Sequence, residues 1–147
     1  MKEGKSVHLS GTLEVPLPQT SAFSLFTPSG ESTWVEGWDP VFPAPVADEI
    51  EPGTVFETHH GDYTIWVVVR CEPGALVEYA RITPGDRAGL VRVECEAASD
   101  NATFVTVSYQ LTALTPEGNS ALDDFAEGYG DFLEQWRQSI QKAIDAG

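Results

Sequence analysis

Apolar and polar residues alternate along much of this chain, which is the pattern of strands with one buried face. The first such segment covers residues 6–15, where Val7, Leu9, Leu13 and Val15 fall on one side. Five more strand-like segments follow, at residues 53–60, 63–72, 75–83, 89–97 and 103–114. Turns rich in Gly, Pro, Asp and Asn separate these five, which predicts hairpins and an antiparallel meander. Gly11 lies on the apolar side of the first segment, where a bend or bulge is expected.

The pattern changes after the last strand, because residues 120–146 place apolar side chains three and four positions apart. These are Leu122, Phe125, Tyr129, Phe132, Leu133, Trp136, Ile140 and Ile144. The spacing predicts one amphipathic helix, which at 1.5 Å per residue would be about 40 Å long. Ser120 followed by Asp123 resembles a capping box at its start. Gly128 and Gly130 each cost about 1 kcal/mol relative to alanine, so close packing of a strand or ligand is expected beside them.

Less regular sequence joins the first strand to the meander. Residues 19–27 predict a short helix that ends before Pro28. Residues 31–52 contain several prolines and little periodicity, so an ordered loop with one helical turn is expected there. This loop contains Trp34, Trp38 and Phe42, and these large aromatic side chains must be buried somewhere.

The order of the elements predicts a single domain over residues 1–147. One helix laid over one face of a curved antiparallel sheet forms a two-layer α+β domain. If the sheet curls around the helix without closing on it, a cavity remains between them. The large side chains that could line that cavity are Trp34, Trp38, Trp66, Tyr79, Tyr109, Phe125 and Tyr129.

Charge and composition exclude some partners. The 23 acidic and 8 basic residues leave a formal net charge of -15, which repels the phosphates of nucleic acid and anionic membrane surfaces. We interpret the charge as a solvated acidic surface and infer no site from it. No segment approaches the roughly 18 apolar residues of a membrane span, so no membrane insertion and a cytoplasmic location are expected. Composition leaves the oligomeric state open.

Few residues suggest metal or acid–base chemistry. Cys71 and Cys95 match no zinc or redox motif, and we expect them to be reduced and inert. His59 and His60 are adjacent on a strand and therefore point to opposite faces, so no metal site is predicted. Surface imidazoles are the favoured interpretation. The alternative is a general base at the cavity mouth, where Glu57 could orient His59.

Tyr79 and Arg81 lie two apart on one strand and so share a face. If that face is the inner one, the guanidinium needs an acidic partner or a ligand anion, because an unpaired buried charge is costly. If it is the outer one, Arg81 forms a surface ion pair. The sequence favours the two placements about equally.

The order of elements and four local patterns resemble the START, polyketide cyclase and pollen-allergen superfamily, also called SRPBCC. The patterns are ESTWVEGWDP at residues 31–40, THHGD at 58–62, YARITPG at 79–85, and the final helix with Phe125, Tyr129 and Trp136. The resemblance implies the helix-grip fold, a curved antiparallel sheet wrapped around a long C-terminal helix. It also implies a cavity for apolar molecules, in which a minority of members do chemistry. Six strands are predicted here, as in some branches, whereas other branches have seven.

The favoured hypothesis is a noncatalytic domain that binds an apolar or aromatic small molecule without a cofactor or metal. The candidate ligand-binding residues are Trp34, Trp38, Trp66, Tyr79, Arg81, Tyr109, Phe125 and Tyr129. One alternative is an enzyme of the polyketide cyclase or aromatase type that uses the same cavity. Another is a co-chaperone-like module that binds protein. Whether the chain is an enzyme is therefore left open.

Overall fold

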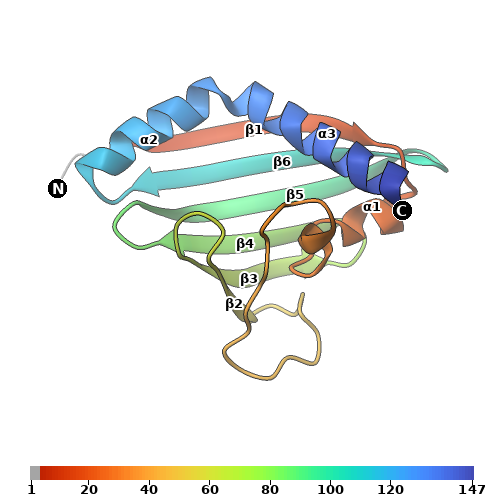
Figure 1. The fold of residues 1–147 in the computed structure, drawn as a ribbon, viewed down its shortest axis with the longest axis horizontal. Coiled ribbons are helices and arrows are strands. Elements are labelled where there is room, and N and C mark those ends of the chain that lie inside the picture. Colours follow the sequence, from red (N-terminus) through yellow and green to blue (C-terminus); the bar gives the residue numbers. More distant parts are fainter. Residues whose placement is uncertain (1–3) are drawn as a thin grey trace.

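The computed structural model describes residues 4–147, and in this range six antiparallel strands form one sheet in the order β1-β6-β5-β4-β3-β2 (Figure 1). The strands are β1 (Ser6–Val15), β2 (Val55–Thr58), β3 (Thr64–Glu72), β4 (Leu76–Thr83), β5 (Arg87–Ser99) and β6 (Ala102–Ala113). Strands β2 to β6 form the predicted meander, and β1 pairs with β6. The alternating pattern is therefore confirmed as the signal of an antiparallel sheet.

The predicted strands match the observed ones closely, except at β2. This strand covers four residues, whereas the sequence predicted residues 53–60. Gly53 and Gly61 have φ angles of +95° and +72°, so the backbone turns on either side of β2. A bulge predicted at Gly11 is wrong, because the pairing of β1 with β6 runs without a shift from Ser6 to Val15. The bulges lie instead between Val68 and Arg70 and between Ala97 and Ser99.

The prediction of one helix over residues 120–146 is wrong. Two helices are present, α2 (Pro116–Glu127) and α3 (Tyr129–Ala146), and Figure 1 shows the change of direction between them. Gly128, with φ -93° and ψ 9°, separates them. The first helix begins earlier than predicted, because Thr115 Oγ1 accepts a hydrogen bond from Gly118 N at 3.1 Å and Pro116 occupies the first turn. The predicted capping box at Ser120 is therefore also wrong.

Close packing beside the helix glycines was also predicted, and it is not observed. A Cβ at Gly130 would meet no atom within 4 Å in the described part of the chain. One at Gly128 would meet only the Asp124 carbonyl oxygen of its own helix, at 3.4 Å. The close approach occurs at Gly11, where a Cβ would lie 2.5 Å from Leu133 Cδ1. The absence of a side chain on β1 thus lets α3 pack directly against this strand.

The segment between β1 and β2 contains little regular structure. Helix α1 (Gln19–Ser24) ends three residues earlier than predicted, and the chain continues in tight turns such as Phe26 N to Phe23 O, 3.0 Å. The expected helical turn in the loop is η1 (Gly30–Thr33), a short 3-10 helix. Beyond it, a bridge between Val41 and Glu57 ties the loop to β2.

Two different layers cover the inner face of the sheet. Helices α2 and α3 run along β1 and β6, and the segment after α1 lies over the β3–β5 side (Figure 1). Trp38 of that segment packs against Trp66 of β3, with ring centroids 5.6 Å apart. Trp34 packs against Trp136 of α3, with centroids 5.1 Å apart. The loop aromatics therefore close the part of the core that the helices leave uncovered.

Candidate ligand-binding site

A cavity of about 260 Å³ lies between the sheet, α3 and the loop that follows α1. Its walls are Glu31, Val35, Trp38, Thr58, His60, Asp62, Thr64, Trp66, Arg81, Thr83, Asp86, Arg87, Tyr109, Phe132 and Trp136. A second hollow of about 20 Å³ shares Glu31, Trp66, Tyr109 and Trp136 with it and extends to Tyr79. We call these two hollows together the central cavity.

Aromatic rings form most of the apolar wall, and hydrogen bonds hold two of them in place. Trp38 Nε1 donates to the Pro28 carbonyl oxygen at 2.8 Å. Trp66 Nε1 donates to Thr58 Oγ1 at 2.9 Å. Because each indole N–H is already satisfied inside the protein, both rings present only carbon to the cavity.

The two tyrosines of the central cavity differ in their hydroxyl groups. The Tyr79 hydroxyl donates to the Phe26 carbonyl oxygen at 2.7 Å and is occupied. Tyr109 is also buried, but its hydroxyl makes no hydrogen bond within residues 4–147. Burial raises the pKa of Tyr109 well above its usual value, so this phenol stays protonated and is free to donate or accept a hydrogen bond.

Arg81 projects from the inner face of β4 into the central cavity, which resolves the two placements that the sequence left open. Its Nη2 donates to Thr83 Oγ1 at 2.6 Å, and its Cζ lies 5.2 Å from the centroid of the Trp66 ring. Burial is the main cause that lowers the pKa of Arg81, and the nearby Arg87 charge lowers it further, while Tyr109, Asp86 and Asp62 raise it by smaller amounts. The group still remains charged at neutral pH, because an arginine pKa is far above 7.

Glu31, in η1, is an acidic group of the central cavity that sequence reasoning missed. The residue as a whole retains partial solvent exposure, but its carboxyl group is enclosed, and this burial raises its pKa well above the usual range. Its negative charge also raises the pKa of Tyr79 and of Tyr109, so the carboxyl lies near both phenols. A carboxyl in such surroundings holds its proton to higher pH than an exposed one.

The histidines lie at the edge of the site. His60 lines the mouth of the cavity, and both His59 and His60 are exposed. The His59 ring contacts the Tyr63 ring, with centroids 5.1 Å apart. Glu57 does not orient His59, since its carboxylate accepts a short hydrogen bond from the Tyr63 hydroxyl instead. Among the described residues, no group of three His, Cys, Asp or Glu side chains could hold a metal ion.

The structure brings together Trp38, Trp66, Tyr79, Arg81 and Tyr109 of the predicted ligand-binding set. The remaining three lie elsewhere. Trp34 is core, with Nε1 donating to the Leu25 carbonyl oxygen at 2.7 Å. Phe125 packs against Tyr109 from the helix side. The Tyr129 hydroxyl donates to the Val107 carbonyl oxygen at 2.6 Å, under β1 and β6. Besides Glu31, the wall residues absent from the prediction include Phe132 and Trp136, although both belong to the predicted apolar helix face.

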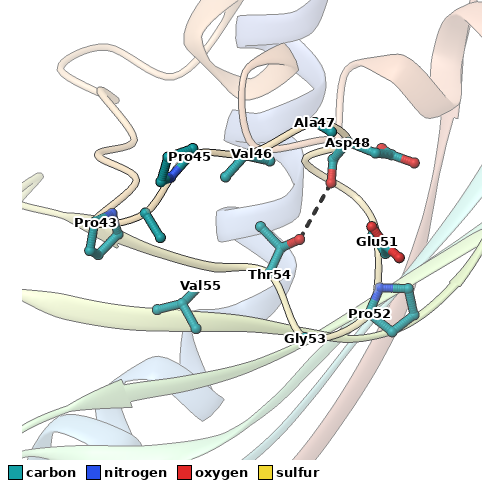
Figure 2. Close-up of a pocket in the computed structure, with 11 residues that line it drawn as sticks. Pro43, Pro45, Val46, Ala47, Asp48, Glu51, Pro52, Gly53, Thr54 and Val55 are labelled. Carbon is teal, nitrogen blue, oxygen red and sulfur yellow. Dashed lines mark hydrogen bonds between the residues drawn. The ribbon is translucent and has the colours of Figure 1, made fainter.

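Other hollows are more open to solvent. Figure 2 shows one of about 430 Å³ in the proline-rich loop before β2, lined by residues 43–48 and 51–55. All of its lining residues except Thr54 are exposed, and Thr54 Oγ1 donates to the Asp48 carbonyl oxygen at 3.4 Å. Because such walls cannot exclude water from a ligand, we take the smaller and more enclosed central cavity as the candidate site.

No family model matches the chain, and no curated protein matches its sequence. Solved structures do match. A START superfamily protein from Mycobacterium smegmatis has a TM-score of 0.69 at 12% identity, covering 95% of this chain and 97% of that chain. Norcoclaurine synthase from Thalictrum flavum, solved with dopamine and hydroxybenzaldehyde, has a TM-score of 0.63 at 10% identity, covering 96% and 87%. DynU16, from the dynemicin biosynthetic locus, has a TM-score of 0.63 at 17% identity, covering 91% of this chain and 47% of that one.

The chain therefore has the helix-grip fold of START-like proteins, and the resemblance to SRPBCC proteins predicted from the sequence is confirmed for the fold. At identities of 10–17% the likeness shows the fold alone, so function has to be argued from the site. Within the described residues, no helix is both long and apolar enough to cross a membrane.

Proposed function

We propose that this chain is a binding domain for an apolar or aromatic small molecule, which occupies the central cavity. The observation that carries the proposal is the enclosure of this cavity by three of the four tryptophans, Trp38, Trp66 and Trp136. Tryptophans that line a hollow leave apolar surface that a ligand can bury.

The volume of the cavity limits the size of the ligand. An engineered apolar cavity of about 150 Å³ holds benzene, and pockets for drug-sized ligands start near 300 Å³. The larger hollow of the central cavity, at about 260 Å³, therefore suits a ligand of one or two rings. Norcoclaurine synthase, which shares the fold, was solved with dopamine and hydroxybenzaldehyde, and both of these are single-ring aromatics. That neighbour supports an aromatic ligand here.

Titration with the neutral fluorescent probe N-phenylnaphthylamine tests the proposal. We expect saturable fluorescence enhancement with the unmodified protein. The variant Val35→Trp would fill the cavity from the loop side, so we expect it to bind the probe about tenfold or more weakly.

The matched control is Val69→Trp, which adds the same side chain at an exposed position of β3 and should leave probe binding unchanged. Failure of the unmodified protein to bind the probe would contradict the proposal. Equal binding by Val35→Trp and Val69→Trp would place the probe outside the central cavity and would also contradict it.

A second candidate is an enzyme of the cyclase type, which Glu31 and Tyr109 favour. Burial raises the pKa of both groups inside the cavity, whereas the histidines are exposed at its edge. A protonated carboxyl next to a phenol can pass a proton to or from a bound carbonyl compound.

Exchange of the α-hydrogens of tetralone in D₂O, followed by NMR, separates the two functions. Exchange that is lost in Glu31→Gln supports the enzyme, and no exchange above the protein-free rate supports a noncatalytic binder.

The protein-binding alternative from the sequence stays a prediction. The exposed large apolar residues lie on several different elements, including Val41 in the loop, Phe104 on β6 and Leu114 after it. Among residues 4–147, no specific contact favours this alternative.

A further inference from the structure

Arg81 has unused hydrogen-bonding capacity inside the central cavity. A guanidinium carries five N–H donors, and the Arg81 group makes one hydrogen bond, from Nη2 to Thr83 Oγ1. Its Nε is buried and has no hydrogen-bond partner within residues 4–147, a property that it shares with Arg92 Nε. Thr83 Oγ1 is in turn 2.8 Å from Thr64 Oγ1, so the hydroxyls beside Arg81 are already engaged with each other.

Arg81 also differs from the other arginines in its charge partners. Each of the other four has a carboxylate within 3.2 Å: Arg70 with Glu72, Arg87 with Asp86, Arg92 with Glu94, and Arg137 with Glu134. Within the described chain, Arg81 has no carboxylate within 4.0 Å, although the sequence contains 23 acidic residues. The acids that act on it from the cavity edge are Asp62 and Asp86, and Asp86 is paired with Arg87 at 2.6 Å.

Arg81 is partly buried and its Nε is fully buried, and a charge in such a place is costly unless an anion pairs with it. The face of Trp66 supplies a cation–π contact, but this contact satisfies none of the N–H donors. The enclosed carboxyl of Glu31 does not supply the anion either, since no ion pair within 4.0 Å joins it to Arg81. No described residue therefore supplies this partner.

We infer that the ligand of the central cavity is an aromatic or apolar carboxylate whose anionic group pairs with the Arg81 guanidinium. The inference rests on the proposed binding function and narrows its ligand class. A carboxylate accepts two parallel N–H bonds from a guanidinium, and within residues 4–147 the two Nη groups of Arg81 make only the one hydrogen bond to Thr83 Oγ1, so N–H donors remain for a ligand. The ring system of the ligand then packs against Trp38, Phe132 and Trp136.

The test compares the naphthoate anion with neutral naphthamide of the same ring position, by calorimetric titration at neutral pH. The two molecules have the same rings and nearly the same shape and differ in charge. A charge-assisted bond inside a protein contributes enough to change affinity about tenfold to a hundredfold, so we expect naphthoate to bind tighter by this factor. In Arg81→Met the preference should vanish while naphthamide still binds. Arg81→Lys should keep part of it.

The matched control is Arg92→Met, because Arg92 lies on the outer side of β5 beside Glu94 and should not affect the preference. Equal affinities of naphthoate and naphthamide for the unmodified protein would overturn the inference and leave the binding function standing. An unchanged preference in folded Arg81→Met would also overturn it. If neither molecule binds, the binding function fails and the inference fails with it. Should Arg81→Met not fold, the comparison on the unmodified protein decides.

Discussion

Glu31 is the residue whose burial has the clearest consequence for folding. In the unfolded chain its pKa is near the ordinary value of about 4.3, whereas enclosure in the central cavity raises the pKa in the folded state. As the pH rises above the unfolded value, the unfolded chain loses this proton while the folded chain keeps it. The unfolded state then binds fewer protons, so the contribution of Glu31 to stability falls with rising pH until the folded pKa is passed.

Replacing Glu31 with glutamine should therefore stabilise the protein at high pH. The amide has the shape of the protonated carboxyl and cannot ionise, so Glu31→Gln should unfold at a higher temperature than the unmodified protein near pH 8. Near pH 4 the difference in unfolding temperature should shrink, because Glu31 is mostly protonated in both states there. Thermal unfolding near pH 8 and near pH 4 measures this difference in unfolding temperature. Glu36→Gln, at an exposed neighbouring position, is the control. A larger rise in unfolding temperature for Glu31→Gln near pH 4 than near pH 8 would contradict the claim that burial raises the pKa of Glu31.

Single residues also show where sequence reasoning stops. The two-residue period of a strand correctly places Tyr79 and Arg81 on one face, because strand geometry is local. Strand periodicity does not say which face of the strand points inward when polar and apolar residues occur on the same face. Trp34, Phe125 and Tyr129 have the same ambiguity, since an aromatic side chain suits a core and a ligand wall equally well. Their contacts with Trp136, Tyr109 and Val107 arise only in the folded molecule.

At the scale of elements, strands were predicted better than helices. Each strand carries its own alternation and its own turn residues, which depend on a few neighbours in sequence. The division of the C-terminal helix at Gly128 was missed because the apolar spacing continues across it from Phe125 to Phe132. Periodicity reports which side is buried and is insensitive to a change of direction between two helices that share a buried face.

The contact between Gly11 of β1 and α3 gives a prediction at this scale. Because a Cβ at Gly11 would lie 2.5 Å from Leu133 Cδ1, Gly11→Val should lower the free energy of unfolding by about 1–3 kcal/mol. Urea denaturation measures the change. The control His8→Val introduces the same side chain on the exposed side of the same strand and should shift stability by less than about 0.5 kcal/mol. Equal stability of the two variants would show that α3 does not pack directly on β1.

At the scale of the whole molecule, the central cavity depends on a loop as much as on the sheet and α3. Trp38 fixes that loop through its contacts with Trp66 and Phe56 and its hydrogen bond to Pro28. Without these contacts of Trp38, the β3 side of the inner face of the sheet would be open to solvent.

Removing the Trp38 side chain should destabilise the protein and expose the loop that precedes β2. We expect Trp38→Ala to lower the free energy of unfolding by about 3 kcal/mol. This value is at the lower end of the range for replacing a large aromatic residue with alanine, because Trp38 is only half-buried. Trp38→Phe keeps a ring and loses the hydrogen bond, so about 1 kcal/mol is expected. Urea denaturation gives both values, and limited proteolysis should cut residues 39–52 faster in the alanine variant. An alanine variant as stable and as resistant as the phenylalanine variant would mean that the loop is held elsewhere.

The sequence by itself determined the strands, the apolar face of the C-terminal segment and hence a two-layer α+β domain, because these follow from periodicity and turn chemistry between near neighbours. The helix-grip class was implied by the resemblance of the element order and local patterns to SRPBCC proteins. Only the tertiary structure decided that Arg81 faces inward without an acid and that Glu31 joins it in the same cavity. Those two residues lie 50 positions apart, on strand β4 and in the short 3-10 helix η1. Their meeting depends on how the loop folds back over the sheet, which the packing of Trp34 and Trp38 sets and no local pattern encodes.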